Sequence, residues 1–579
     1  MSHKRSSWLE ERRAIRFFRG EASIIITMLS SLFICAFGAL FNGALGQDAQ
    51  PPGDILAAGI EALGGMDNIS RIETVSYVGP RIYRTRTVME SFSITGLDKF
   101  TSTTGQQNIS FSYDGPYIKQ RIDRFHQLDA AWGWARPLLE PFNFSLVIQG
   151  GSEGFAAVVA GSYNLLAPGA PPSGYRDGLQ AAFHISEANK MSPLLLTAIR
   201  SSNYTQVEEE ISTGERLPAV YDPALDLTVI FNPNTSLPYI IRSYEDHRLW
   251  GRSTHDLLVH DYAQTEGVMF PRRFKTFYNG NLPLGDYLVD EVLINQVADP
   301  AHFDGPEGLT ELNTPAHDDS YGFAEIGEYT ASYLWEGQYT GTFANISATT
   351  PYPDIPGAWV LTFQDAPTYR QMVLELDDSV IVFDAPAHQN LLVMQWVEET
   401  LGKSVTHVWP THHHHDHALG VADYIANGAK LITVEEAREY YTTVPASQFL
   451  TYSTHAPLVL EGANVQATFI HMNGSLHAWD QSYAHITPSC TAANSTSLIF
   501  DADHATPFAL DVGDHGSILE LVDRMSDDRV ATDTFVVSAH SDPVPLSLYV
   551  ETIGYRYPTY SSLDYRFGVP ACSENKVAS

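Results

Sequence analysis

The sequence predicts an α/β domain at residues 320–560, preceded by an α+β domain with a mainly antiparallel sheet at residues 54–300. In the first region, short apolar or alternating runs are separated by turn residues, which is typical of antiparallel strands. From 358 onward, apolar β-branched runs alternate with amphipathic stretches, which is typical of α/β domains. Residues 299–320 are rich in Asp, Pro and Gly, and we place the domain boundary there. We expect residues 561–579 to form a C-terminal tail.

Length and charge limit the class of protein. The chain has 579 residues, of which 44% are hydrophobic, so it can bury sizeable cores in several domains. Its 68 acidic residues outnumber its 34 lysines and arginines, which gives a net charge of −34 at pH 7. This balance argues against a nucleic-acid partner, because phosphates need a basic surface.

The first 50 residues predict a targeting segment. A span without charged residues at 22–46 follows six basic residues, which are Lys4, Arg5, Arg12, Arg13, Arg16 and Arg19. Two interpretations remain open: a signal peptide cleaved after Ala44-Leu45-Gly46, or an uncleaved signal anchor, which needs about 20 apolar residues. Either one places the chain after Gln47 in the lumen or outside the cell, secreted or anchored to the membrane through this segment.

Sequons and cysteines also bear on export. Eight Asn-x-Ser/Thr sequons are typical of a secretory glycoprotein, and they lie at Asn68, Asn108, Asn143, Asn203, Asn234, Asn345, Asn473 and Asn494. Cys35 falls in the apolar span. Cys490 and Cys572 would both meet an oxidising compartment and could form a disulfide, with two unpaired thiols as the alternative.

The first domain begins with a predicted helix at 54–63, which ends at a Gly-Gly pair. Strand-like runs follow, for example at 227–231 and 273–278, and another helix is predicted around 177–191. A short helix followed by a strand meander resembles the half-barrel of bacterial lipoprotein carriers. This resemblance implies a lipid-like ligand groove or a substrate cap, and a purely structural partner domain is the alternative.

The strongest chemical signal is the segment 411–420, with the sequence Thr-His-His-His-His-Asp-His-Ala-Leu-Gly. Imidazole and carboxylate groups are usual ligands of zinc and neighbouring transition metals. A strand predicted at 404–409 precedes the segment and a helix predicted at 418–429 follows it, so the ligands would lie at the carboxyl end of a strand. His412 and His414 can point the same way on an extended segment. A solvated polyhistidine loop is the alternative.

The pattern Thr-His-x-His-x-Asp-His-x-x-Gly at 411–420 resembles the signature of the metallo-β-lactamase superfamily. The resemblance covers residues 320–560 and implies an αββα sandwich with one or two metal ions at its edge. Most members of this superfamily are hydrolases that use a metal-bound hydroxide. Some are iron-dependent oxygenases or oxidoreductases.

The resemblance also assigns site residues outside the central motif. In the family, an acid at the end of the strand corresponding to 379–383 supports the metal loop, and Asp384 occupies this place. We assign catalytic roles to Asp384 and Asp416. Family members often place a histidine ligand in a Gly-Ser-x-His turn, which favours His477 over the nearby His485.

Two later strands supply the remaining predicted ligands. The strand at 496–500 leads to Asp503, in the place of the family's bridging carboxylate, whose two oxygens can hold two metal ions. The strand at 534–540 ends in His540, although the glycines usual beside this histidine are missing. His515 precedes a predicted helix, and we expect it to be a surface residue.

The resemblance therefore implies two metal sites. The first would contain His412, His414 and His477, and the second Asp416, His417 and His540, with Asp503 between them. We predict two zinc ions as cofactors, with iron or manganese as alternatives. A zinc ion held by three histidines lowers the pKa of its bound water to about 7.

The sequence as a whole predicts an exported, metal-dependent hydrolase that acts on a small molecule. Two other classes remain open. One is an iron-dependent oxygenase or oxidoreductase of the same fold. The other is a non-catalytic lipid-binding protein with a vestigial metal site, against which the intact motif at 412–417 argues. No substrate is predicted.

Glycosidase treatment tests the predicted export. We expect protein from its native host to migrate faster on a gel once N-linked glycans are removed, because the sequons after Gln47 would meet the glycosylation machinery. Unchanged mobility together with cytosolic fractionation would contradict export.

Overall fold

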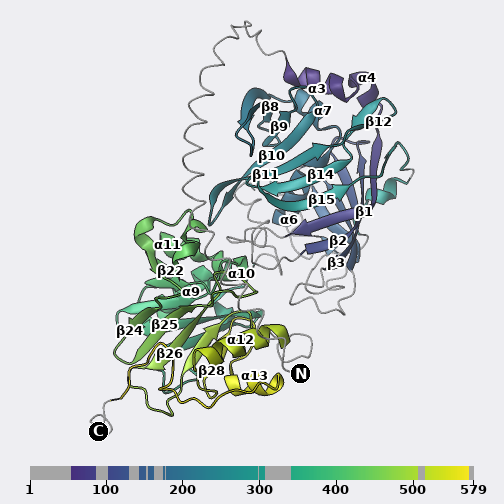
Figure 1. Ribbon diagram of the computed structural model, residues 1–579. Coiled ribbons are helices and arrows are strands. Elements are labelled where there is room, and N and C mark those ends of the chain that lie inside the picture. The colour runs from purple at the N-terminus through teal and green to yellow at the C-terminus, as the bar shows by residue number, and fades with distance from the viewer. Residues whose placement is uncertain are drawn as a thin grey trace, which may run out of the picture. The chain divides into compact units, whose positions relative to one another are not determined.

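The computed structural model describes residues 54–86, 102–128, 142–151, 154–161, 174–175, 178–297, 299–306, 339, 341–505 and 515–572 (Figure 1). The predicted targeting segment at 1–50 and most of the predicted boundary at 299–320 lie outside these residues. Within them, no helix has both the length and the apolar character needed to span a membrane. Residues Ile55–Ser579 form one compact unit.

The N-terminal half of the described chain builds one large sheet whose strands pair antiparallel throughout, as predicted for residues 54–300. Its strand order is β6-β5-β4-β3-β2-β1-β15-β14-β11-β10-β9-β8-β7, with β16 paired to β1. The strands are β1 (Thr74–Arg86), β2 (Ser102–Ser112), β3 (Lys119–Leu128), β4 (Phe142–Gln149), β5 (Phe155–Gly161), β6 (Gly174–Tyr175), β7 (Thr205–Glu210), β8 (Arg216–Asp222), β9 (Leu227–Phe231), β10 (Pro238–His247), β11 (Gly251–His260), β14 (Arg273–Tyr278), β15 (Leu282–Leu288) and β16 (Glu291–Ile294). A small hairpin of β12 (Ala263–Thr265) and β13 (Val268–Phe270) stands apart from it.

Three helices share a buried apolar core with this sheet: α3 (Ile55–Leu63), α6 (Gly178–Met191) and α7 (Leu195–Arg200). The short helices α4 (Met66–Ile69) and η1 (Pro300–Phe303) complete this part. Helix α3 approaches the sheet closely, because a Cβ at Gly59 would lie only 2.6 Å from the ring of Phe231. The helices predicted at 54–63 and 177–191 are therefore confirmed.

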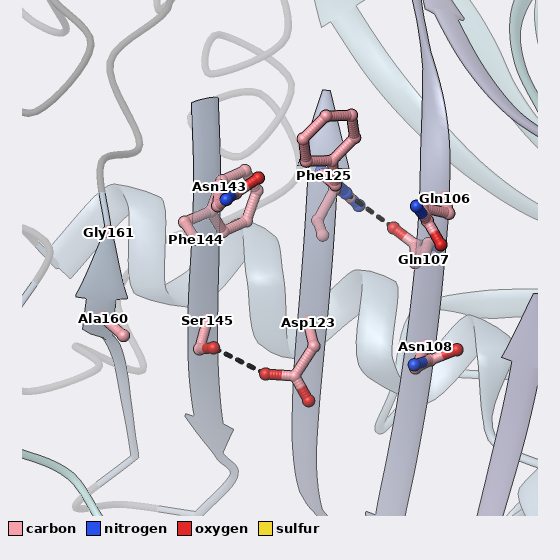
Figure 2. A pocket seen from close by; sticks show the side chains of 11 residues that line it. Gln106, Gln107, Asn108, Asp123, Phe125, Asn143, Phe144, Ser145, Ala160 and Gly161 are labelled. Atoms are coloured by element: carbon pink, nitrogen blue, oxygen red, sulfur yellow. Dashed lines mark hydrogen bonds between the residues drawn. The ribbon is translucent and has the colours of Figure 1, made fainter. Parts of the chain in front are cut away.

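Two pockets bear on the predicted lipid-like groove. One, of about 310 Å³, lies over β2 to β5 and is lined by polar side chains such as Asn108, Asp123 and Asn143 (Figure 2). The other, of about 40 Å³, is lined largely by apolar residues such as Leu195 and Phe274. A cavity that small has room for only a few water molecules. The larger pocket also has the apolar residues Phe125 and Phe144 in its lining. The lipid-like groove stays a prediction.

The residues from 341 onward build two mixed sheets. The first has the order β17-β18-β19-β20-β21-β22-β23, antiparallel up to β20 and parallel from β20 to β23. Its strands are β17 (Ile346–Thr349), β18 (Ala358–Phe363), β19 (Ala366–Leu376), β20 (Ser379–Phe383), β21 (His407–Trp409), β22 (Lys430–Val434) and β23 (Phe449–Tyr452). The second has the order β24-β25-β26-β27-β28-β29, antiparallel except for the parallel pair β27–β28. Its strands are β24 (Leu458–Glu461), β25 (Val465–His471), β26 (Ser482–Pro488), β27 (Leu498–Asp501), β28 (Phe535–Ser538) and β29 (Val544–Pro545).

Apolar side chains from both sheets meet in one core. Phe383 of β20 packs against Phe469 of β25 and Phe500 of β27, with ring centroids 5.9 and 5.5 Å apart. Side chains of α9 (Asn390–Leu401) and α11 (Val421–Ala426) join the same core. The alternate residues of the second sheet, such as Ile470 and Ile499, belong to another core with α12 (His515–Asp527) and α13 (Leu546–Thr552). Figure 1 shows these two helices beside the second sheet. The remaining helices are α10 (His415–Ala418), η2 (Phe343–Asn345), η3 (Glu435–Glu439) and η4 (Ala446–Gln448).

One predicted helix has the wrong boundaries. The prediction was a single helix at 418–429, whereas the chain becomes helical already at His415 and is interrupted at Gly420, between α10 and α11. A Cβ at Gly420 would lie 2.8 and 2.9 Å from the carbonyl oxygens of Pro386 and Ala385. This position therefore needs glycine, because the helix start lies directly against the loop that follows β20.

A disulfide joins Cys490 to Cys572, with their Cα atoms 4.5 Å apart. The paired alternative is thus confirmed for these two cysteines. Tyr565 is buried in the core beneath α12 and α13. The segment predicted as a tail at 561–579 is consequently attached to the second sheet as far as Cys572.

Reduction of this disulfide should destabilise the protein. The bond closes a loop between residues 82 positions apart, and loss of such a cross-link costs about 2–5 kcal/mol of unfolding free energy. Urea unfolding with and without reductant measures this cost. A Cys490→Ser variant should lose the sensitivity to reductant, and an unchanged wild-type midpoint would contradict a stabilising role.

Candidate metal centre

The motif at 411–417 covers the loop that follows β21 and the first residues of α10. Strand β21 lies parallel between β20 and β22, and its last residue, Trp409, is buried against Phe383 and Phe469. The loop therefore starts from a rigid strand at the carboxyl edge of the parallel strands. This is the position that the sequence predicts for the ligands.

Three imidazoles converge at the first predicted site. The Nε2 atom of His477 lies 3.2 Å from Nε2 of His412 and 3.1 Å from Nδ1 of His414. Ligand atoms of all three lie within 4.8 Å of one another. A tetrahedral zinc ion, with Zn–N distances of about 2.0–2.1 Å, separates its nitrogen ligands by about 3.3 Å. The spacing of these nitrogens therefore fits a three-histidine zinc site.

The second predicted group also converges. One ligand atom from each of Asp416, His417, Asp503 and His540 lies within 4.8 Å of the others. The Nε2 atoms of His417 and His540 are 3.3 Å apart, and Oδ2 of Asp416 lies 3.3 and 3.6 Å from them. This group combines two imidazoles with two carboxylates, a donor set that suits several transition metals.

Asp503 touches both groups. Its Oδ2 lies 3.2 Å from Nε2 of His412, 3.1 Å from that of His477 and 3.1 Å from that of His417, while Oδ1 lies 3.0 Å from Nε2 of His540. Both oxygens are buried, yet neither has a hydrogen bond of normal geometry among the described residues. A buried carboxylate without such bonds needs another source of positive charge, and a bridging position between two cations would supply it.

Asp384 fixes the loop from behind. Its Oδ1 accepts hydrogen bonds from the backbone N–H and the hydroxyl of Thr411, at 2.8 and 3.0 Å, and Oδ2 lies 3.0 Å from Nδ1 of His417. The residue is fully buried and has a positive φ of 62°, which is uncommon for a residue other than glycine. Its contact with Nδ1 leaves Nε2 of His417 to face the metal site.

Charge and burial keep His412 and Asp503 in their metal-binding protonation states. Burial lowers the pKa of His412 well below its usual value, and the neighbouring His414 and His417 lower it further. Burial would raise the pKa of Asp503, but the charges of His417 and His477 hold it well below its usual value. A neutral imidazole and an ionised carboxylate are the forms that bind metal ions. For His417 and His540, burial lowers the pKa, but the neighbouring carboxylates outweigh burial and raise the pKa above its usual value.

The other histidines near the motif serve different contacts. His413 Nδ1 lies 2.7 Å from Oδ1 of Asp480, and the ring of His415 packs against His247 and Trp250. Nε2 of His471 lies 2.7 Å from the carbonyl oxygen of Trp479. His413 and His415, which lie between the predicted ligands in the sequence, thus contact other residues and belong to neither ligand group. The side chain of His515 lies outside the described residues, and its backbone begins α12.

His485, the alternative to His477, lies away from the site. It is in the middle of β26, a strand that the sequence analysis did not predict, and it packs on Tyr565 with ring centroids 4.0 Å apart. Burial lowers its pKa to about 3, so it stays neutral. The structure brings His477 to the first group and makes His485 a core residue.

Sequence analysis also missed an ionic chain beside the site. His504 lies between two acids, with Nδ1 2.8 Å from Oδ1 of Asp501 and Nε2 3.3 Å from Oε1 of Glu520 on α12. Burial lowers the pKa of His504, but the two carboxylates outweigh it and raise the pKa to about 10. The only signal in the sequence for this ionic chain was a histidine directly after Asp503, the predicted bridging acid. Its partner Glu520 is too distant in sequence to be inferred.

Of three comparisons with known proteins, only the search of solved structures found matches. No protein-family model matches the sequence, and a search of curated proteins found no match. The solved structures similar to this chain include metallo-β-lactamases. The enzyme from Hirschia baltica shares 15% identity over 37% of this chain and 99% of its own, with a TM-score of 0.27. The enzyme from Pontibacter korlensis shares 16% identity over 36% of this chain and 97% of its own, with a TM-score of 0.26. A point mutant of a flavo di-iron protein from Thermotoga maritima shares 12% identity over 36% of this chain and 60% of its own, with a TM-score of 0.27.

Metal content tests the choice between the two histidines. We expect His477→Ala to weaken zinc binding by at least about 10-fold, because the first group loses one of three nitrogens. His485→Ala should lower stability through lost packing against Tyr565 but leave zinc binding unchanged. Zinc titration of both purified variants measures this, and the reverse ranking would contradict the assignment.

Proposed function

We propose that residues 341–572 form an αββα sandwich of the metallo-β-lactamase type and act as a metal-dependent hydrolase. The observation that carries this proposal is the place of Asp503, whose two oxygens lie within 3.2 Å of imidazoles from both ligand groups. A carboxylate in this position can bridge two metal ions, because it has two oxygens.

Each residue of the predicted site would have a separate role in such a centre. His412, His414 and His477 would hold the first metal ion, and Asp416, His417 and His540 the second, with Asp503 shared. Bound zinc would supply a water of lowered pKa as nucleophile and an electrophile for the leaving group or the developing oxyanion. Asp384 orients the imidazole of His417 and fixes the loop at Thr411. We assign Asp416 to the second metal ion as well as to the catalytic machinery.

A redox function is the second candidate, and the composition of the second group favours it. Apart from the shared Asp503, this group consists of Asp416, His417 and His540, and two histidines with one carboxylate are the ligand set of many non-haem iron oxygenases. The first group, with three histidines, favours zinc instead. The identity of the bound metal therefore separates the two candidates.

Export and a small-molecule substrate belong to the same proposal. Six of the eight sequon asparagines are exposed and the other two are partly exposed, so all are accessible to glycosylation. The disulfide between Cys490 and Cys572 suits an oxidising compartment. We propose a secreted or membrane-anchored protein with its metal centre in the lumen or outside the cell.

Metal analysis followed by substrate screening tests the proposed function. Elemental analysis of protein from its native host should give about two zinc ions per chain. A panel of esters, lactones, phosphoesters and lactams should then reveal hydrolysis that a chelator abolishes. Iron as the bound metal, with no hydrolysis of the panel, would favour the oxygenase or oxidoreductase.

Asp503→Asn tests the shared carboxylate. The change keeps the shape of the side chain but removes the charge that would hold two dications together. We expect about one metal ion per chain instead of two, and a loss of activity of at least roughly 10²-fold, or about 3 kcal/mol of transition-state stabilisation. Metal analysis and steady-state kinetics measure both. Full metal content and full activity would contradict a dinuclear hydrolase.

Asp384→Asn is the matched control, because it removes another fully buried carboxylate near the site. It should weaken metal binding by roughly 10–100-fold through a misoriented His417, as changes to groups that hold a ligand do. Activity should return at high zinc concentration, which distinguishes this variant from Asp503→Asn.

A further inference from the structure

Among the seven predicted ligands, His477 is the one least fixed by burial. Its side chain is 23% exposed, whereas those of Asp416, the most exposed of the second group, and Asp503 are 7% and 2% exposed. His477 also lies in the turn that joins the antiparallel strands β25 and β26, and not directly after a parallel strand. The position of its ring therefore depends on contacts that hold the backbone of this turn.

Two consecutive N–H groups of the turn are held by side chains. The N–H of His477 donates to the hydroxyl of Ser475 at 3.1 Å, a contact within the turn itself. The N–H of Leu476 donates to both oxygens of Glu520, at 3.1 and 3.3 Å. The N–H of Leu476, one residue before the ligand, therefore ties this turn to α12.

Glu520 has a second partner on the other side. Its Oε1 lies 3.3 Å from Nε2 of His504, whose Nδ1 lies 2.8 Å from Oδ1 of Asp501. The backbone N–H of His504 also donates to Oδ2 of Asp501, at 3.1 Å. These contacts fix the turn 501–504, which carries Asp503. One carboxylate thus touches both the His477 turn and the Asp503 turn.

The helix that carries Glu520 is well anchored. Ile518, Leu521, Val522 and Met525 are fully buried against the second sheet. Glu520 itself is only 20% exposed, so its carboxylate is partly shielded from water and its ion pair is stronger than a surface pair. A rigid helix face and a shielded carboxylate make an effective anchor for a turn.

We propose that Glu520 is a positioning residue that couples the turn carrying His477 to the turn carrying Asp503 and so sets the geometry of the first metal site. This inference rests on the proposed metal centre. Glu520 makes no contact with the predicted ligand atoms themselves in the described contacts, so it acts through Leu476 and His504.

Zinc affinity, measured by chelator competition on the full chain, tests this role without any substrate. Glu520→Ala should weaken zinc binding at the first site by roughly 10–100-fold, as loss of a group that orients a ligand does. Glu520→Gln keeps the volume and an oxygen for the Leu476 N–H, so it should retain more of the affinity. It also guards against a failure of Glu520→Ala to fold. Asp527→Asn, which removes an exposed carboxylate from the same helix, should leave the affinity unchanged.

A double-mutant cycle shows whether Glu520 acts through His477. In the His477→Ala background, Glu520→Ala should cause a smaller further loss of affinity than in the wild type, because only its contact with the Asp503 turn still positions a ligand. Additive losses, or a Glu520→Ala protein that binds zinc like the wild type, would overturn the positioning role while leaving the metal centre intact. A wild-type chain that binds no metal ion would instead overturn the proposed function itself.

Discussion

The burial of Asp503 among four imidazole nitrogens is the constraint on which the loops of the metal centre depend. A buried carboxylate without hydrogen bonds of normal geometry is costly, and so are several imidazole nitrogens about 3 Å apart. Metal ions bound between the imidazole nitrogens and the Asp503 oxygens would offset this cost, because both kinds of atom are metal ligands. The contacts of Asp384, Asp501 and Glu520 hold the turns and loops that carry these donors.

The topology explains how donors far apart in sequence reach one place. Asp384 follows β20 and the 411–417 loop follows β21, and these two strands are parallel neighbours in the first sheet. Asp503 follows β27 and His540 follows β28, which are the parallel pair of the second sheet. Parallel neighbours present their carboxyl ends at the same edge, so each pair delivers two loops together. The shared core of the two sheets then brings both edges into register.

This topology also explains which parts of the site could be predicted from sequence. Asp384, Asp503 and His540 each follow a parallel strand, and the family resemblance assigned them to the site because they come after apolar runs that are visible in the sequence. The structure brings them close to the motif at 411–417. His485 was harder to exclude, since only the pairing of β26 with β25 and β27 shows that it lies within a strand. Glu520 could not be found at all. Its role depends on the packing of α12, which the amphipathic pattern predicts as a helix but not as a neighbour of the His477 turn.

The predicted ligands differ in how much of each side chain is exposed to solvent. Asp503, His412, His417 and His540 are nearly inaccessible, whereas His477 is 23% exposed. Solvent therefore reaches the first group from the side of the β25–β26 turn. Leu476, directly before His477, is among the most exposed large apolar residues of the described chain, at 61%. The turn that Glu520 holds therefore carries both the most exposed predicted metal ligand and an exposed apolar side chain.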